Sequence, residues 1–166
     1  MVTTADVKKL REETGAGVMD SKRALEEADG DFERARELLR ERGVVAAAKR
    51  ADRATSEGLV ESYIHADGRL GALVEVNCET DFVARTETFK TLAHDIAMHV
   101  VAMDPQGLAP EDVPEDAVGS PEEQALMTQP FFRDPARTVS DLIQEAMSQT
   151  GEHVRVSRFA RFELGS

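Results

Sequence analysis

Cys78 is the only cysteine in the 166-residue chain, and a thiol beside a histidine base is one arrangement that supports nucleophilic catalysis. The histidines that might act as the base are His65, His94 and His99. Apolar and other residues alternate before Cys78, which places its side chain on one predicted strand face with Leu70, Ala72, Val74 and Val76. Burial raises the pKa of a thiol and makes it unreactive. We therefore predict that Cys78 is a core residue rather than a nucleophile.

Metal and phosphate chemistry have little support in the sequence. His94 and His99 are separated by five positions, roughly 140° around a helix, whereas paired metal ligands on a helix use i and i+4. The segment Gly15-Ala16-Gly17 lies between two predicted helices and lacks the strand that precedes a phosphate-binding loop. We predict no metal site, no cofactor and no covalent enzyme chemistry.

The segment Thr80-Asp81-Phe82-Val83 follows the alternating run and places a carboxylate beside a large apolar ring. In one interpretation Asp81 caps a turn, and Phe82 folds back into the core. In the other interpretation both side chains are displayed to a binding partner. The pattern of residues leaves both interpretations open.

The composition limits the possible partners and compartments. The chain has 32 acidic and 20 basic residues and a formal net charge of -12, which opposes a primary nucleic-acid surface. No run of about 18 apolar residues is present, so we expect no membrane-spanning helix. A single cysteine fits a reducing compartment. We therefore expect a cytoplasmic protein that binds other proteins or small ligands.

The first ~45 residues have helical spacing of apolar side chains. Thr3 and Asp6 form a capping-box pattern, and Gly15 supplies a stop signal. A second helix ends at Asp29-Gly30, and Asp31 caps a third that is predicted to end at Gly43. We predict a three-helix module over residues 1–45, a connecting helix or linker over 46–56, and a core domain over 57–166.

The core has the pattern of an α+β fold. Residues 58–66 and 70–78 alternate around Asp67-Gly68, which predicts a β-hairpin. An amphipathic helix is expected over 86–103, a surface loop over 104–121 and a second helix from Thr138 to Gly151. A last strand over 153–164 completes a three-stranded antiparallel sheet with helices on one side. We expect one face of this strand to carry Val154, Val156, Ala160, Phe162 and Leu164.

Several long segments resemble the signature blocks of the bacterial elongation factor Ts family. They are TGAGVMDSKRALEEADGDFERARELLRERG, AAAKRADR, EGLVESYIH, LVEVNCETDFVAR, QPFFRDPARTV and RFARFELG, and they occur here in the family's order. The resemblance covers most of the chain apart from residues 104–127. The TGAG and NCETDFVAR blocks are long and highly specific.

The resemblance implies both a fold and an activity. Its N-terminal module would be similar to ubiquitin-associated domains, and the chain would promote release of GDP from elongation factor Tu, the GTPase that delivers aminoacyl-tRNA. The segment Thr80 to Val83 would enter the GTPase near its magnesium ion, with Phe82 as a wedge. Leu10, Val18 and Met19 would hold the nucleotide domain, with Val18 in place of a methionine common in the family.

The chain also departs from the family pattern. It has one copy of the core and lacks the charged helical stretch that usually precedes the QPF block, so only residues 117–128 stand there. Short family members tend to pair, and we therefore expect a homodimer through the sheet. The alternative function is a non-catalytic helical module that binds a ubiquitin-like or other protein partner.

Overall fold

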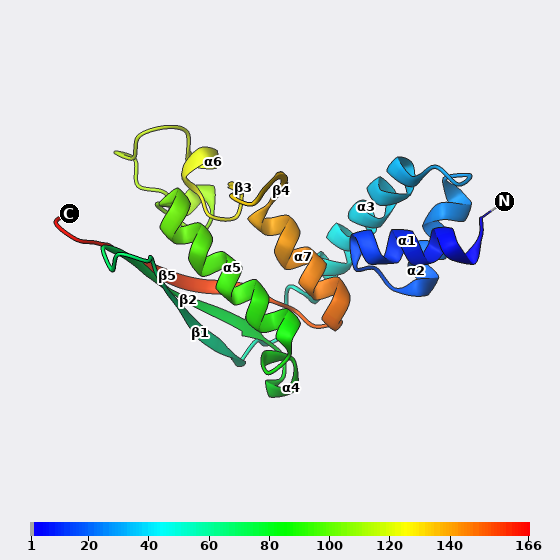
Figure 1. Cartoon of the computed structure of the whole chain (residues 1–166), viewed down its shortest axis with the longest axis horizontal. Helices are drawn as coiled ribbons and strands as arrows, with labels where there is room; N and C mark the ends of the chain where they lie inside the picture. The colour runs from blue at the N-terminus through cyan, green and yellow to red at the C-terminus, as the bar shows by residue number, and fades with distance from the viewer. Residues whose placement is uncertain (1) are drawn as a thin grey trace. The chain divides into compact units, whose positions relative to one another are not determined.

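The computed structural model describes residues 2–166, which form two compact units. Residues 2–53 belong to the first unit together with Gln144–His153, and the second contains Ala54–Ile143 and Val154–Ser166. Helix α7, Val139–Thr150, therefore contributes residues to both. Figure 1 labels the elements in chain order. Among the described residues, no helix is long and apolar enough to cross a membrane.

The first unit begins with α1, Thr4–Thr14, α2, Val18–Glu27, and α3, Phe32–Arg50. The predicted capping box is present, since the Thr3 hydroxyl accepts from the Asp6 amide and the Asp6 carboxylate accepts from the Thr3 amide. Gly15 ends α1 at φ 67°, a left-handed conformation that suits glycine. The Asp31 carboxylate accepts from the Arg34 amide at 3.0 Å and caps α3. These local signals set the beginnings and ends of the helices.

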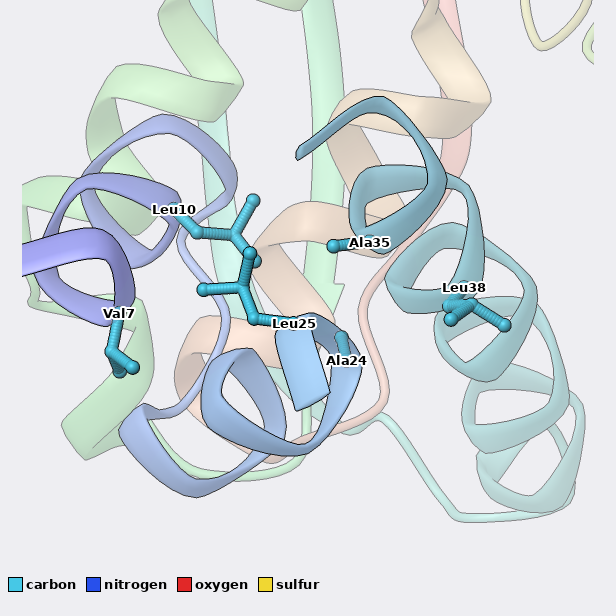
Figure 2. Close-up of a cluster of buried hydrophobic side chains, with 6 residues drawn as sticks. All are labelled: Val7, Leu10, Ala24, Leu25, Ala35 and Leu38. Atoms are coloured by element: carbon cyan, nitrogen blue, oxygen red, sulfur yellow. The ribbon is translucent and has the colours of Figure 1, made fainter. Parts of the chain in front are cut away.

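A small apolar core holds the three helices together (Figure 2). Leu10 and Leu25 are fully buried and point toward one another between the helices. The buried members of the cluster are Val7, Leu10, Ala24, Leu25, Ala35 and Leu38.

Helix α3 does not end at Gly43, as the sequence predicted, but continues to Arg50. Glycine costs about 1 kcal/mol in a helix interior. The alanine-rich run that follows has high helix propensity, which favours continuation through that glycine. Residues 46–50 are therefore helical and belong to α3, within the first unit.

The second unit contains the predicted three-stranded antiparallel sheet. Strands β1, Glu57–Ile64, β2, Leu70–Cys78, and β5, Arg155–Glu163, lie in the order β1-β2-β5. The β1–β2 register pairs Glu57 with Cys78 and Ile64 with Gly71. This confirms an α+β fold built around a three-stranded sheet.

Helix α5, Glu87–Met103, covers one face of this sheet (Figure 1). The predicted apolar stripe of α5 is buried, namely Phe89, Leu92, Ala93, Ile96, Ala97 and Val100. The facing side chains of β2 are Ala72, Val74, Val76 and Cys78, and they are buried as well. The opposite face of the sheet, which we call the outer face, carries the alternate residues of each strand.

The last strand contains a β-bulge at Ser157, so the predicted set of side chains on one face is wrong beyond that residue. Val76 pairs with Val156, but Glu75 pairs with Arg158, so Ser157 is an extra residue on β5. One extra residue reverses the alternation of every side chain that follows. Val156 is therefore buried, whereas Ala160, Phe162 and Leu164 lie exposed rather than on the same face as Val156.

The segment between α5 and α7 contains small elements that the sequence indicated weakly or not at all. A 3-10 turn, η1, covers Pro110–Asp112, and α6 covers Pro121–Gln124. Strands β3, Pro130–Phe131, and β4, Asp134–Thr138, form a two-stranded sheet that we did not predict. The Thr138 hydroxyl accepts from the Asp141 amide, as expected for the start of α7.

His99 is a fully buried histidine that joins α5 to the β3 region. Its Nε2 lies 3.0 Å from Gln129 Oε1, and its Nδ1 accepts from the Phe132 amide at 3.3 Å. The ring stacks on Phe131 with 6.0 Å between centroids. A nitrogen that accepts from an amide must be unprotonated, and burial lowers the pKa of His99.

We expect acid to destabilise the second unit through His99. An unfolded histidine titrates near pH 6.5, so below that pH the unfolded chain binds a proton that the folded chain resists. The contribution is complete above about pH 6.5 and is lost as the pH falls toward the lowered folded pKa. Melting temperatures at pH 7.5 and 5.5 measure this effect. His99→Asn should reduce the difference in melting temperature between the two pH values, whereas the exposed control His65→Asn should retain it. Equal differences for the two variants would show that His99 is not the source of the acid sensitivity.

Candidate functional site

The segment Thr80–Val83 forms the start of a single helical turn, α4, Asp81–Ala84, which directly follows β2. The Thr80 hydroxyl accepts from the Val83 amide at 3.3 Å and caps this turn. Val83 and Ala84 are buried against the sheet side of the unit. Because successive helical residues are about 100° apart, burial of Val83 and Ala84 directs Asp81 and Phe82 outward.

Phe82 is 76% exposed, which is unusual for a large aromatic side chain. With its neighbours Asp81, Arg85 and Thr86 it lines a shallow open depression. The interpretation in which Phe82 folds back into the core is therefore wrong. The backbone that carries this exposed ring is held in place by the buried Val83 and Ala84 of the same turn.

Hydrogen bonds on both sides hold the α4 turn in place. The Cys78 thiol is buried and donates to the Thr80 carbonyl, with Sγ 3.2 Å from the oxygen. The Thr86 hydroxyl donates to the Val83 carbonyl at 2.7 Å and accepts from the Phe89 amide at 3.3 Å, so that it also caps α5. The predicted burial of Cys78 is confirmed.

Asp81 has a charged partner one turn away. Its Oδ2 lies 2.9 Å from Arg85 Nη2, and both side chains are largely exposed. An acid that precedes a base by four residues is the more favourable order on a helix. The tip of the turn, formed by Asp81, Phe82 and Arg85, therefore presents an aromatic ring beside an ion pair. Arg85 was not among the predicted site residues, although its i+4 spacing from Asp81 indicated the pair.

The second set of predicted site residues lies on the helical module. Val18 and Met19 begin α2 and are 54% and 57% exposed. Leu10 was placed with them, but it is fully buried in the helix core (Figure 2). A side chain with no exposed area cannot contact a partner unless the module rearranges. Leu10 therefore supports the module from within, and of the three predicted residues only Val18 and Met19 are exposed.

The histidines have separate contacts. His65 Nδ1 lies 3.2 Å from the Tyr63 hydroxyl, and His94 Nδ1 lies 3.3 Å from Glu61 Oε1. Within residues 2–166, no group of three or more His, Cys, Asp or Glu side chains is arranged to hold a metal ion.

The outer face of the sheet is a second exposed apolar surface. Ile64, Gly71 and Phe162 lie in register across β1, β2 and β5, and the Ile64 side chain covers Gly71. A methyl group at residue 71 would lie 2.6 Å from Ile64 Cδ1, so the exposed end of the Ile64 side chain would have to move aside. A shallow groove on this face is lined in part by Ile64, Gly71, Leu73, Phe162 and Leu164.

Sequence comparisons with known proteins show the family of this chain. The family model described as Elongation factor TS matches residues 8–124, a range that includes both the α4 turn and the exposed pair on α2. The chain belongs to the elongation factor Ts family. It is therefore a translation elongation factor, and nucleotide exchange on elongation factor Tu follows from that membership.

Curated relatives agree over nearly the whole chain. An elongation factor Ts from Rubrobacter xylanophilus is 50% identical over 188 residues, which cover 95% of this chain and 96% of the relative. Those from Moorella thermoacetica and Carboxydothermus hydrogenoformans are 48% and 47% identical over 195 residues, covering 99% of this chain and 96% and 90% of the relatives. These alignments exceed the 166 residues present here, so the relatives carry internal residues that this chain lacks.

Proposed function

We propose that this chain releases GDP from elongation factor Tu by inserting the tip of the α4 turn beside the nucleotide site. The observation that supports this most directly is the 76% exposure of Phe82 on a turn whose other residues are anchored. Exposed aromatic residues are frequent centres of binding energy at protein interfaces. In this proposal Thr80 caps the turn, Val83 anchors it in the core, and Asp81 and Phe82 contact the GTPase near its magnesium ion.

Exchange by this route is competition between two binding partners and involves no covalent step. Weakening bound nucleotide by ~10⁴ requires about 5.5 kcal/mol of differential binding between two states of the GTPase. A buried aromatic wedge and the contacts around it are a suitable source of that energy. Linkage requires that GDP weakens the binding of this chain by the same factor. The chain therefore needs no cofactor of its own.

We propose that Val18 and Met19 form a second contact with the GTPase. Their exposure at the start of α2 suits an apolar contact, and the three-helix unit would act as a ubiquitin-associated-like binding module. Its role is to increase affinity rather than to displace nucleotide. The alternative, a module that binds another protein without exchange, would use this same pair.

Met19→Ala and Leu10→Ala are expected to distinguish a residue that contacts the partner from one that stabilises the helical module from within. Met19→Ala should weaken binding to the GTPase by roughly 5- to 10-fold with little change in melting temperature, because Met19 is exposed. Leu10→Ala should cost about 2.7–5 kcal/mol of stability, because it leaves a cavity in the module. Titration calorimetry and thermal melts measure the two effects, with the exposed Val44→Ala as a control. Normal affinity for Met19→Ala would exclude it from the contact.

Release of a fluorescent GDP analogue from elongation factor Tu tests the exchange function. The chain should accelerate release in a concentration-dependent manner. A chain that binds the GTPase without accelerating release would instead support the alternative of a plain interaction module.

We propose that the outer face of the sheet forms a homodimer. The face is apolar around Ile64, Leu73 and Phe162, and Phe162 is 70% exposed. At the other end of the face, Arg158 Nε donates to Glu75 Oε2 at 2.7 Å, which provides a charged rim. A self-complementary apolar centre with a polar edge is typical of two-fold interfaces. We further propose that the chain acts in the cytoplasm, where elongation takes place, without direct contact with nucleic acid or membrane.

A further inference from the structure

The ion pair between Asp81 and Arg85 has no evident role in folding. Both side chains are more than half exposed, and exposed pairs contribute about 0–1 kcal/mol to stability. The α4 turn is already held by the Thr80 cap and by buried Val83. The pair lies instead at the side of Phe82, where the four lining residues form the depression. A partner that contacts the Phe82 ring would therefore also lie close to this ion pair.

Contact through Phe82 also removes water from Asp81. The two residues are adjacent on the outward side of one helical turn, so a partner surface that covers the ring covers the neighbouring carboxylate. A carboxylate that loses its water is strongly disfavoured unless it is paired. GDP carries negatively charged phosphates, which repel an unpaired carboxylate brought near them. The formal net charge of -12 on the chain adds to this repulsion.

We propose that Arg85 is a positioning residue for exchange, which rests on the proposed function of the α4 turn. Its guanidinium, 2.9 Å from the Asp81 carboxylate, lets that carboxylate enter the interface as part of a neutral pair. It also fixes the direction of the carboxylate, because Asp81 is the first residue of α4 and Arg85 is its C-cap. Arg85 therefore acts through Asp81 rather than through its own contact with the GTPase.

Double-variant kinetics distinguish this role from a direct contact. Arg85→Gln should slow GDP release at saturating concentrations of the chain about tenfold, because it leaves Asp81 unpaired when water is excluded. Arg85→Lys keeps the charge and should restore the rate to within about threefold of the original. In the Asp81→Asn background the carboxylate charge is gone, so adding Arg85→Gln should cause no further loss. This non-additivity is the expected signature of a residue that acts through its neighbour.

The controls separate failure of this inference from failure of the proposed function. Arg137 Nε lies 2.8 Å from Asp134 in a similar local pair, so Arg137→Gln should leave release unchanged. All variants should keep their melting temperature, because the altered side chains are exposed. A normal rate for Arg85→Gln, or losses that multiply in the double variant, would overturn the inference. If the Phe82→Ala variant also accelerated GDP release from elongation factor Tu at the normal rate, the proposed role of the whole α4 turn would be wrong as well.

Discussion

Phe82→Ala is expected to slow GDP release by roughly 10- to 1000-fold while the chain remains folded. The magnitude corresponds to about 1.4–4 kcal/mol of lost hot-spot energy. The ring is 76% exposed, so its removal leaves no cavity, and the melting temperature should stay within a few degrees of the original. Fluorescent-GDP release and a thermal melt on the same preparation provide both values.

Two further variants make the result specific to Phe82. Val118 is 90% exposed in the loop between η1 and α6, so Val118→Ala should change neither exchange nor stability. Phe89 is fully buried on α5, so Phe89→Ala should cost about 3–5 kcal/mol of stability. If Phe82→Ala behaved like the Phe89 variant, with normal exchange per folded molecule, Phe82 would not be the wedge.

Phe162→Asp is expected to convert the proposed dimer into a monomer. A two-fold interface contains each substitution twice, so two carboxylates would be buried near the apolar centre without partners. Unpaired charge in such a position should raise the dissociation constant at least about 100-fold. Sedimentation equilibrium at micromolar concentration should show about twice 18.2 kDa for the original chain and 18.2 kDa for the variant.

Val118→Asp is the matched control for the dimer, since it introduces the same charge at an exposed apolar residue away from the sheet. It should remain dimeric. A monomer mass for the unaltered chain, or a dimer that survives Phe162→Asp, would remove the outer face as the interface. Circular dichroism should show that Phe162→Asp is folded, because residue 162 is exposed in the single chain.

The sequence predicted those features that depend on local pattern. The Thr3 and Thr138 caps, the hairpin around Asp67-Gly68 and the buried stripe of α5 follow from residue types at fixed spacing, and each is present. Whether Phe82 lay inside or outside could not be decided in this way. Its exposure depends on how α4 packs against the sheet, which involves residues far away in the chain.

The wrong predictions have different causes. Leu10 has an apolar side chain at helical spacing, as an exposed patch residue would, and only the packing of three helices shows that it is buried. Glycine frequently ends a helix, but the alanine-rich run after Gly43 favours helix and allows α3 to continue. In the two-stranded β3–β4 sheet, β3 has only 2 residues and the side chains of β4 do not alternate in burial. The i+4 spacing from Asp81 indicated Arg85 as an ion-pair partner, but its place beside an exposed Phe82 depends on how α4 packs.

The bulge at Ser157 restricts how the chain can vary in length during evolution. The Ser157 hydroxyl donates to the Asn77 side chain, which holds the extra residue in place. Deletion of that one residue would turn Phe162 toward α5 and turn Phe159 and Arg161 to the outer face, because strand side chains alternate. Insertions or deletions in the second half of β5 should therefore survive selection in pairs of residues, whereas single-residue changes should be confined to the loops.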